Sequence, residues 1–319
     1  MAKVLSLIKL LFGLTISVRE FKDLIVPIAA RKYQLLFEII LKKYDPSLNL
    51  NYTKLFKIKK FINEGRGAGI LKPNRKLSSP TSDIFEKIFY NDSPGLNPNI
   101  RFNKNISPHL INLNIRTPKI IEIVCGEKLT VFLFEFLKLN RIPAGEEYRT
   151  LKETTINMFY PPDSALKSDK IQYDRFIIGN ERLIKAEYFS ELELFKLNAV
   201  VKSTPVYFQH FDLKEDNVFM GNIIIDWDNS GNYHLGADFG VLLLSYFVFN
   251  ERDFFNCYKD EIRDYFNRVD LNIPFDIFYL SVLFHFLNLY HGYSSEEEHL
   301  QKIHPVIRDC KLKLKEVTL

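Results

Sequence analysis

Two short stretches carry the most specific pattern of this chain: QHFDLKEDNVF, residues 209–219, and IIIDWD, residues 223–228. The first stretch fits H-x-D-x-x-x-x-N through His210, Asp212 and Asn217, and Asp226 follows Asn217 at a spacing of nine residues. Phosphoryl transfer from a magnesium nucleotide needs a carboxylate that orients the acceptor hydroxyl, plus an amide and a second carboxylate that hold the metal. The spacing therefore predicts that Asp212 acts on the acceptor and that Asn217 and Asp226 bind Mg²⁺.

Length and composition predict a folded protein. The chain has 319 residues, 46% of them hydrophobic and 26% charged, which is enough for one large domain or two lobes and too apolar for a disordered chain. The three cysteines lie far apart and form no C-x-x-C. Neither a disulfide framework nor a zinc site is indicated, and a cytoplasmic location is expected.

Positive charge is concentrated near the amino terminus. Residues 1–76 carry 16 Lys and Arg against 5 Asp and Glu, a net +11, so the remainder carries −7 of the total of +4. The apolar run from Val4 to Val18 is shorter than the ~20 residues of a membrane span, and residues 1–55 have the pattern of basic amphipathic helices. Peripheral contact of residues 1–45 with the inner face of a membrane is one interpretation. Packing of these helices on the catalytic body is the other.

Two upstream features are typical of a nucleotide site. Gly65, Gly67 and Gly69 alternate in a turn between apolar segments, where backbone N–H groups would approach phosphates closely, although a tight hairpin is the alternative. Residues 84–90 have strand composition and carry Lys87, which would reach the α- and β-phosphates. An exposed strand cation is the alternative for Lys87.

The order of the expected elements indicates an α+β fold. Residues 118–137 predict a β-hairpin with Gly126 near its turn, after a polar, turn-rich stretch over 91–117. Strands followed by helices around a catalytic hairpin indicate a two-lobed body. Asp238 is expected to cap the helix after it, and Pro305 to kink or divide the last helix. Helices are expected over 146–159, 186–201, 239–249, 254–268, 275–290 and 296–314, with a short strand at 206–208 and a loop over 230–237.

Residues 209–249 resemble the aminoglycoside phosphotransferase and choline-kinase-like family, which shares the protein-kinase fold. His210, Asp212 and Asn217 match its catalytic loop, Ile225-Asp226-Trp227 matches its metal motif, and residues 235–243 are similar to its later L-G-x-D-L-x-x-L-L stretch. The resemblance implies that the ATP γ-phosphoryl group is transferred, with Mg²⁺, to a hydroxyl of a small molecule or glycan such as a sugar, aminoglycoside or choline-like acceptor. His210 would be a structural member of the catalytic group that braces the loop.

The same resemblance implies a division of the chain. Residues 1–55 would form a helical extension, 56–137 a small β-rich nucleotide-binding lobe, and 138–319 a larger helical lobe for catalysis and acceptor binding. The backbone of Glu135 and Phe136, at the end of the second hairpin strand, would then bind adenine at the hinge.

A second acidic residue competes for the metal. Asp238-Phe239-Gly240 spells the D-F-G metal motif of protein kinases, but Asp238 lies 21 residues after Asn217, whereas Asp226 lies nine after it. The hairpin that joins the two metal-binding positions is normally short, and residues 220–222 form a suitable tight turn. Asp226 is therefore assigned to the metal, while a turn at residues 229–232 keeps Asp238 as the alternative.

The chain also departs from the family. Phe211 stands where the family usually has glycine, and the glutamate expected to pair with Lys87 is missing before Pro118, so Glu122 becomes a candidate. A nucleotide-binding pseudokinase scaffold is accordingly the alternative function. No nucleic-acid-binding motif accompanies the basic amino terminus, so no nucleic-acid partner is expected. The acceptor and the oligomeric state stay open.

Overall fold

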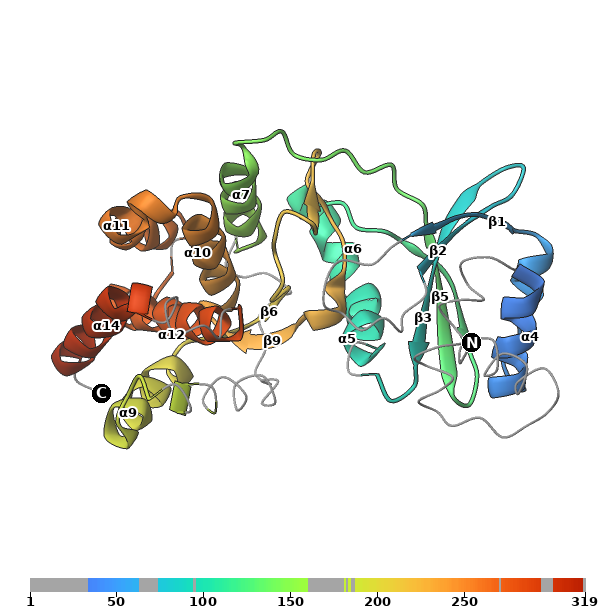
Figure 1. Ribbon diagram of the computed structural model, residues 1–319. Helices are drawn as coiled ribbons and strands as arrows, with labels where there is room; N and C mark the ends of the chain where they lie inside the picture. The colour runs from blue at the N-terminus through green and yellow to red at the C-terminus, as the bar shows by residue number, and fades with distance from the viewer. Residues whose placement is uncertain are drawn as a thin grey trace. The chain divides into compact units, whose positions relative to one another are not determined.

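The chain falls into two units (Figure 1). Unit 1 comprises Met1–Asn103 and Pro118–Lys138, and unit 2 comprises Lys104–Thr117 and Leu139–Leu319. The computed structural model describes residues 34–62, 74–93, 96–159, 181, 183–184, 187–269, 271–293 and 301–317. Unit 1 is β-rich and unit 2 is helical, which confirms the predicted α+β class with a small β-rich amino-terminal part and a larger helical carboxyl-terminal part.

Unit 1 is built on a five-stranded antiparallel sheet in the order β1-β2-β3-β5-β4. The predicted strand over 84–90 and the hairpin over 118–137 are confirmed, with Gly126 in the hairpin turn. The strands are β1 (Lys57–Ile62), β2 (Asn74–Ser78), β3 (Asp83–Tyr90), β4 (Ile120–Cys125) and β5 (Leu129–Glu135).

Both faces of this sheet are covered. Successive strand residues point to opposite faces, and α4 (Gln34–Tyr44) contributes its apolar side to the core on one of them. Phe37 and Ile40 of α4 share that core with Ile84 and Ile88 of β3, whereas Phe89 belongs to a second cluster with Phe132 and Phe134 of β5. The described part of the basic amino-terminal segment therefore packs on the sheet, as the second interpretation of that segment expected.

A buried ion pair lies on the face that α4 covers. Arg75 of β2 and Glu86 of β3 are cross-strand partners and both are fully buried. Tyr52 donates its hydroxyl hydrogen bond to Glu86, and the Arg75 guanidinium lies 4.1 Å from the ring centroid of Phe37. The charges are thus enclosed by residues that precede β1.

The carboxylate of Asp45 joins the end of α4 to the β4–β5 turn. Its Oδ2 accepts hydrogen bonds from the backbone N–H groups of Lys128 at 2.8 Å and Leu129 at 2.9 Å. Gly126 is required in this turn, because a Cβ there would lie 2.2 Å from Asp45 Oδ2. Burial raises the pKa of Asp45, but these N–H groups and the Ser47 side chain outweigh burial and hold the pKa below its ordinary value.

Replacing Asp45 should destabilise the protein in a pH-dependent way. We expect Asp45→Ala to lower the free energy of unfolding by about 2 kcal/mol near pH 7, because two N–H groups lose a charged acceptor. A carboxylate with a lowered folded-state pKa contributes stability above its unfolded pKa of about 4 and loses it as the pH falls through the folded value. Thermal unfolding should show a difference in Tm that narrows below about pH 4.

Glu127→Ala, which removes an exposed carboxylate of the same turn, is the control and should leave the Tm unchanged. A difference in Tm between Asp45→Ala and wild type that is equal at pH 3 and pH 7 would contradict this account of Asp45.

The polar stretch over 91–117 forms short helices instead of the expected turns. Pro98 and Pro108 lie near the starts of two of them, where a proline is tolerated because the first N–H groups of a helix have no intrahelical partner. The segments are α5 (Leu96–Arg101), a π-helical segment η3 (Phe102–Ile106), α6 (Ser107–Leu110) and the 3₁₀ helix η4 (Ile111–Leu113).

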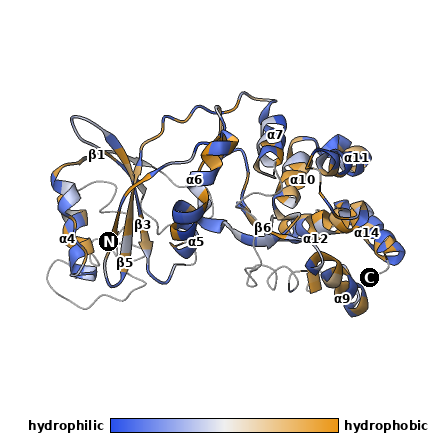
Figure 2. Cartoon of the chain, turned by 180° about the vertical axis from the view of Figure 1, so that it is seen from behind, coloured by the Kyte–Doolittle hydropathy of each residue, from blue (hydrophilic) through white to orange (hydrophobic). Residues whose placement is uncertain are grey.

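Unit 2 is organised around α10 and α12, its most apolar helices (Figure 2). All the expected helices of this unit for which the structure describes the residues are present. Ser190 and Glu193 form a capping box that starts α9 later than predicted, and α14 starts at His304 with Pro305 in its first turn. The helices are α7 (Glu147–Phe159), α9 (Glu191–Lys202), α10 (Ala237–Phe249), α11 (Glu251–Val269), α12 (Phe275–Tyr293) and α14 (His304–Glu316).

Two small sheets complete unit 2. The loop predicted over 230–237 was wrong, because residues 231–234 form a fully buried strand that pairs with the predicted strand near 206–208. This pairing joins segments that are far apart in the sequence, and residues 231–234 show no alternation of apolar and polar residues that would predict a strand. The strands are β6 (Val206–Gln209) with β9 (Gly231–His234), and β7 (Val218–Phe219) with β8 (Ile223–Ile224).

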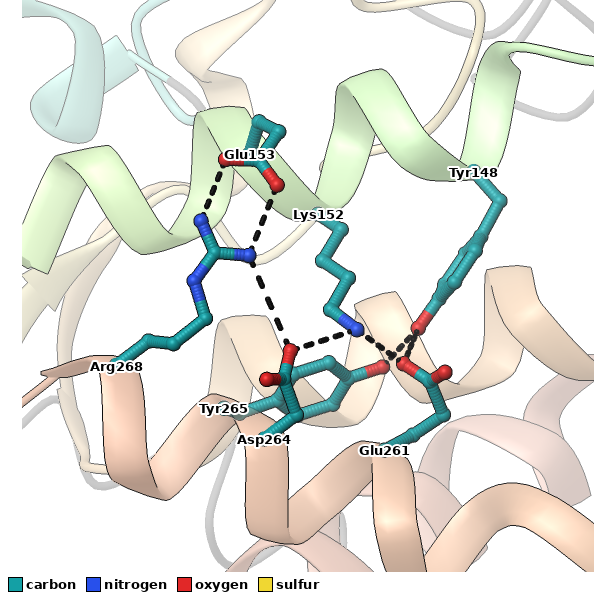
Figure 3. A network of polar contacts seen from close by, with 7 residues as sticks. All are labelled: Tyr148, Lys152, Glu153, Glu261, Asp264, Tyr265 and Arg268. Atoms are coloured by element: carbon teal, nitrogen blue, oxygen red, sulfur yellow. Dashed lines mark hydrogen bonds and ion pairs between the residues drawn. The ribbon is translucent and has the colours of Figure 1, made fainter.

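A polar network fixes α7 against α11 (Figure 3). Tyr148 donates to Glu261 at 2.7 Å, and Lys152 Nζ lies 2.6 Å from Glu261 and 2.8 Å from Asp264. Arg268 pairs with Glu153 through two contacts of 2.8 and 2.6 Å.

Among the described helices, none combines the length and the apolar character needed to cross a membrane.

Candidate active site

The loop over residues 210–217, here called the catalytic loop, connects β6 to the β7–β8 hairpin. Val218 pairs with Ile224 and Phe219 with Ile223, which leaves residues 220–222 as the turn. Gly221 has a φ of 78° and Asn222 a φ of 55° in that turn. The predicted tight turn is confirmed, and it folds the chain back so that Asp226 returns toward Asn217.

The structure brings Asp212, Asn217 and the segment before Asp226 together. The side-chain Nδ2 of Asn217 donates to the backbone oxygen of Asp212 at 2.8 Å and to its Oδ2 at 3.1 Å. The N–H of Ile225 donates to the backbone oxygen of Asn217 at 2.9 Å. The residue immediately before Asp226 is therefore held against Asn217.

His210 braces this arrangement from inside. The N–H of Asp212 donates to His210 Nδ1 at 3.2 Å, so Nδ1 is the acceptor nitrogen and Nε2 carries the proton. His210 Nε2 then donates to the backbone oxygen of Ile225 at 2.9 Å, and the buried ring lies 4.5 Å from the Trp227 ring. The imidazole links the two segments that carry Asp212 and Asp226.

Asp238 holds the loop backbone and does not cap its helix. Its side chain is fully buried, and its two oxygens accept the N–H groups of His210 at 2.9 Å and Phe211 at 2.7 Å. The capping prediction was wrong, because α10 starts after Gly236 at a φ of 108° and Asp238 points back to the loop. Burial raises the pKa of Asp238, although the N–H groups of His210 and Phe211 act to lower it.

This engagement bears on the D-F-G alternative. A metal at Asp238 would have to share fully buried carboxylate oxygens that each already accept a backbone N–H. Gln209 completes the connection, since its Oε1 accepts the N–H of Asp238 and its Nε2 donates to two backbone oxygens of β9. Sequence reasoning missed Gln209, and its place directly before the H-x-D motif was the available signal.

Lys214 is a second residue whose contact was not expected. Its Nζ lies 3.0 Å from Oδ1 and 3.1 Å from Oδ2 of Asp212, and its side chain is half-exposed. The neighbouring Asp216 pairs instead with Arg141 at 2.7 Å. An ammonium group therefore lies directly beside the carboxylate that would receive the acceptor hydroxyl.

Asn217 and Asp226 fit a magnesium ion. The Asn217 Nδ2 faces Asp212, so its carbonyl Oδ1 is the atom suited to a cation, and Asp226 is an exposed carboxylate. Mg²⁺ prefers oxygen ligands and usually takes one or two protein carboxylates, with water and substrate phosphates completing its shell. Within the described ranges, no group of three or more His, Cys, Asp or Glu residues is placed to hold a metal ion.

The predicted nucleotide residues belong to unit 1. Lys87 lies in β3 between Asn74 and Phe132, and its ammonium is 5.3 Å from the ring centroid of Phe89. The side chain is buried, so the exposed-cation alternative was wrong. Gly65, Gly67 and Gly69 lie outside the described residues.

Glu122 does not face Lys87. Cross-strand partners share a face of the sheet. Lys87 is opposite Phe132, which is opposite Ile123, whereas Glu122 is opposite Leu133. The two side chains therefore lie on opposite faces of the sheet, and Glu122 is excluded as the partner of Lys87.

The backbone N–H groups of both predicted hinge residues, Glu135 and Phe136, already donate hydrogen bonds within unit 1. The N–H of Glu135 donates to the Lys119 oxygen at 2.9 Å, and that of Phe136 to the Asp83 oxygen at 3.3 Å. The Phe136 ring lies 3.6 Å below the ammonium of Lys76. An adenine contact at these two residues would therefore use their carbonyl oxygens.

Comparison with known proteins places the site within a family match. No curated protein matches the chain. Similar solved structures include aminoglycoside phosphotransferase APH(3'')-Id from Streptomyces rimosus, with 12% identity, a TM-score of 0.46 and coverage of 68% of this chain and 89% of that one. A microcompartment-associated aminopropanol kinase shows 13% identity and a TM-score of 0.46, covering 81% of this chain and 91% of that one. The spectinomycin phosphotransferase APH(9)-Ia shows 13% identity and a TM-score of 0.44, covering 84% and 98%.

The model of the phosphotransferase enzyme family matches residues 159–269, which contain the whole catalytic loop and Asp226. This agrees with the motif resemblance carried by His210, Asp212, Asn217 and Asp226. Over residues 159–269 the chain is therefore similar to the phosphotransferase enzyme family.

Proposed function

We propose that this protein transfers the γ-phosphoryl group of ATP to a hydroxyl of a small-molecule or glycan acceptor. The contacts of Asp212 carry the proposal, because the Asn217 amide and the Lys214 ammonium each lie within 3.1 Å of its carboxylate. Asp226 supplies the second carboxylate next to Ile225. These are the parts that phosphoryl transfer requires.

Each residue has a distinct task in this mechanism. Asp212 would orient the acceptor hydroxyl and take its proton, and Lys214 would offset negative charge beside it. Asn217 and Asp226 would hold Mg²⁺, which neutralises charge on the β- and γ-phosphates when bound. His210 and Asp238 keep the loop in place. Lys87 and the turn with Gly65, Gly67 and Gly69 would position the phosphates, and the Glu135 and Phe136 carbonyl oxygens would meet adenine.

The aromatic residues of the carboxyl-terminal helices do not identify the acceptor. Tyr265, Phe278, Phe284 and Tyr290 are all fully buried, so these rings form core and would not stack on a sugar or enclose an amine. Cytoplasmic location and membrane contact through residues 1–45 stay predictions, since α4 is the only helix of that segment within the described residues and its apolar side packs on the sheet.

A nucleotide-binding pseudokinase scaffold is the second candidate. The sequence favours it at one point, because the glutamate expected as the partner of Lys87 is missing before Pro118. The intact set of Asp212, Asn217 and Asp226 favours the enzyme.

Phosphoryl transfer to a panel of acceptors distinguishes the two. The full-length protein would be incubated with γ-labelled ATP, Mg²⁺ and separate pools of amino sugars, amino alcohols and glycans. We expect labelled product from one pool, and loss of that product when Mg²⁺ is chelated. Stabilisation by Mg·ADP in thermal unfolding, with neither labelled product nor ATP hydrolysis in any pool, would favour the scaffold and contradict the proposal.

A further inference from the structure

We infer that Phe211 is a positioning residue that fixes the separation of Asp212 from the turn bearing Asp226. The inference rests on the proposed function, because it assigns these two carboxylates to the acceptor and the metal. Phe211 stands between His210 and Asp212, where its backbone conformation determines the direction of the Asp212 side chain.

The backbone of Phe211 is in the left-handed region, with a φ of 61°. This conformation favours glycine, because a Cβ crowds the neighbouring carbonyl oxygen, and a bulky residue keeps it only when the surroundings impose it. One restraint is the bond from the Phe211 N–H to Asp238 Oδ1 at 2.7 Å. The bonds from the His210 N–H to Asp238 and from the Asp212 N–H to His210 Nδ1 hold the residues on either side, and the packed ring restrains Phe211 itself.

The ring of Phe211 is anchored on two elements of unit 2. It stacks on Tyr233 of β9, with centroids 4.5 Å apart and planes at 22°, and meets the His285 ring of α12 edge-on at 6.4 Å. Ala237 and Leu289 complete the cluster. Burial, with a smaller contribution from His234, lowers the pKa of His285 to about 3, so this neighbour is an uncharged ring.

Tyr233 connects the Phe211 ring to the segment that follows Asp226, the predicted metal ligand. Its hydroxyl donates to the backbone oxygen of Asn229 at 2.7 Å, and Asn229 ends the short helix that begins directly after Asp226. The stacked pair therefore links the residue before Asp212 to the turn after Asp226. The His210–Ile225 bond links the residue two before Asp212 to the one before Asp226.

The His210–Ile225 bond alone would let the Asp212 segment rotate relative to the Asp226 segment. The second connection, through Phe211, Tyr233 and Asn229, restricts that rotation and so fixes the separation of the two carboxylates. Displacement of a reacting group by about 1 Å can cost about 10²-fold in rate. The Phe211–Tyr233 stack would therefore keep Asp212 at a fixed separation from the residues that would hold the metal.

Paired substitutions separate the backbone effect of Phe211 from its burial. Phe211→Ala loses the ring but keeps a Cβ, so the loop should leave the left-handed conformation. We expect kcat to fall about 10²-fold with the KM for ATP within about twofold. Phe211→Gly also loses the ring, but glycine has no Cβ and adopts the left-handed conformation without strain. The kcat of Phe211→Gly should therefore be about fivefold or more higher than that of Phe211→Ala.

A metal readout tests the same inference without an acceptor. Mn²⁺ would be titrated in the presence of ADP and followed by electron paramagnetic resonance. The half-saturating Mn²⁺ concentration should rise in Phe211→Ala and partly return in Phe211→Gly. Tyr233→Leu should resemble Phe211→Ala, and the Phe211→Ala, Tyr233→Leu double variant should be no worse than the poorer single variant.

Phe247→Ala is the matched control, because it removes a buried ring of α10 that packs on Phe254 and Tyr290. It should lower the Tm without changing Mn²⁺ binding. Wild-type Mn²⁺ binding in Phe211→Ala, or equal losses in the Ala and Gly variants, would overturn the inference. Wild-type protein that phosphorylates no acceptor would instead contradict the proposed function, and the Mn²⁺ titration would still decide the role of Phe211.

Discussion

Asp212→Ala is expected to reduce kcat by about 10²- to 10⁴-fold while the KM for ATP stays within about twofold. The carboxylate is the group placed to receive the acceptor proton, and its loss removes a contact needed only when the hydroxyl attacks. Lys214 and Asn217 would also lose their shared partner, since both contact Asp212 within 3.1 Å. Steady-state kinetics on the acceptor pool that gives product is the measurement.

Asp216→Ala is the matched control for that variant. Asp216 is a carboxylate of the same loop, but it is half-exposed and pairs with Arg141. Exposed ion pairs contribute about 0–1 kcal/mol, so this variant should keep kcat within about twofold of wild type. Equal kcat losses in the Asp212 and Asp216 variants would indicate that the loop's charge, and not the position of Asp212, supports turnover.

Asp238→Asn is expected to impair both stability and turnover despite its nearly identical shape. The two Asp238 oxygens accept two separate N–H groups, and an amide offers only one acceptor oxygen. Either His210 or Phe211 would then present its N–H to the amide NH₂. Because a hydrogen bond to a charged group contributes about 1.5–3 kcal/mol, we expect the free energy of unfolding to fall by about 2–3 kcal/mol.

The catalytic consequence follows from the same two bonds. Release of either N–H frees the backbone just before Asp212, so kcat should fall by about tenfold or more. Denaturant unfolding and steady-state kinetics would be measured together, with Asp260→Asn on the exposed side of α11 as the control. Full activity in a stable Asp238→Asn protein would show that the loop holds its shape without this carboxylate.

Local patterns in the sequence were sufficient for the loop and for most elements. His210, Asp212, Asn217 and Asp226 are close in sequence, and one tight turn at 220–222 is enough to bring them together. Helical periodicity likewise identified α7, α10, α11 and α12. The buried side of each helix is formed by apolar residues that are close in sequence, so the pattern is visible without the rest of the fold.

Non-local contacts explain what the sequence could not show. Strand β9 exists because it pairs with β6, and Asp238 turns away from its own helix because the catalytic loop presents two N–H groups to it. The faces of Lys87 and Glu122 depend on a strand register that only the assembled sheet defines. A propensity or spacing rule contains none of these long-range relations.

The packing of α4 has a practical consequence for dissecting the amino terminus by deletion. A chain that began at residue 56 would lack α4, Asp45 and Tyr52, and would leave one face of the sheet and the Arg75–Glu86 pair open to water. Loss of membrane attachment in such a shortened protein would report misfolding as readily as a missing anchor. A shortened chain that tests the anchor alone has to begin no later than Gln34.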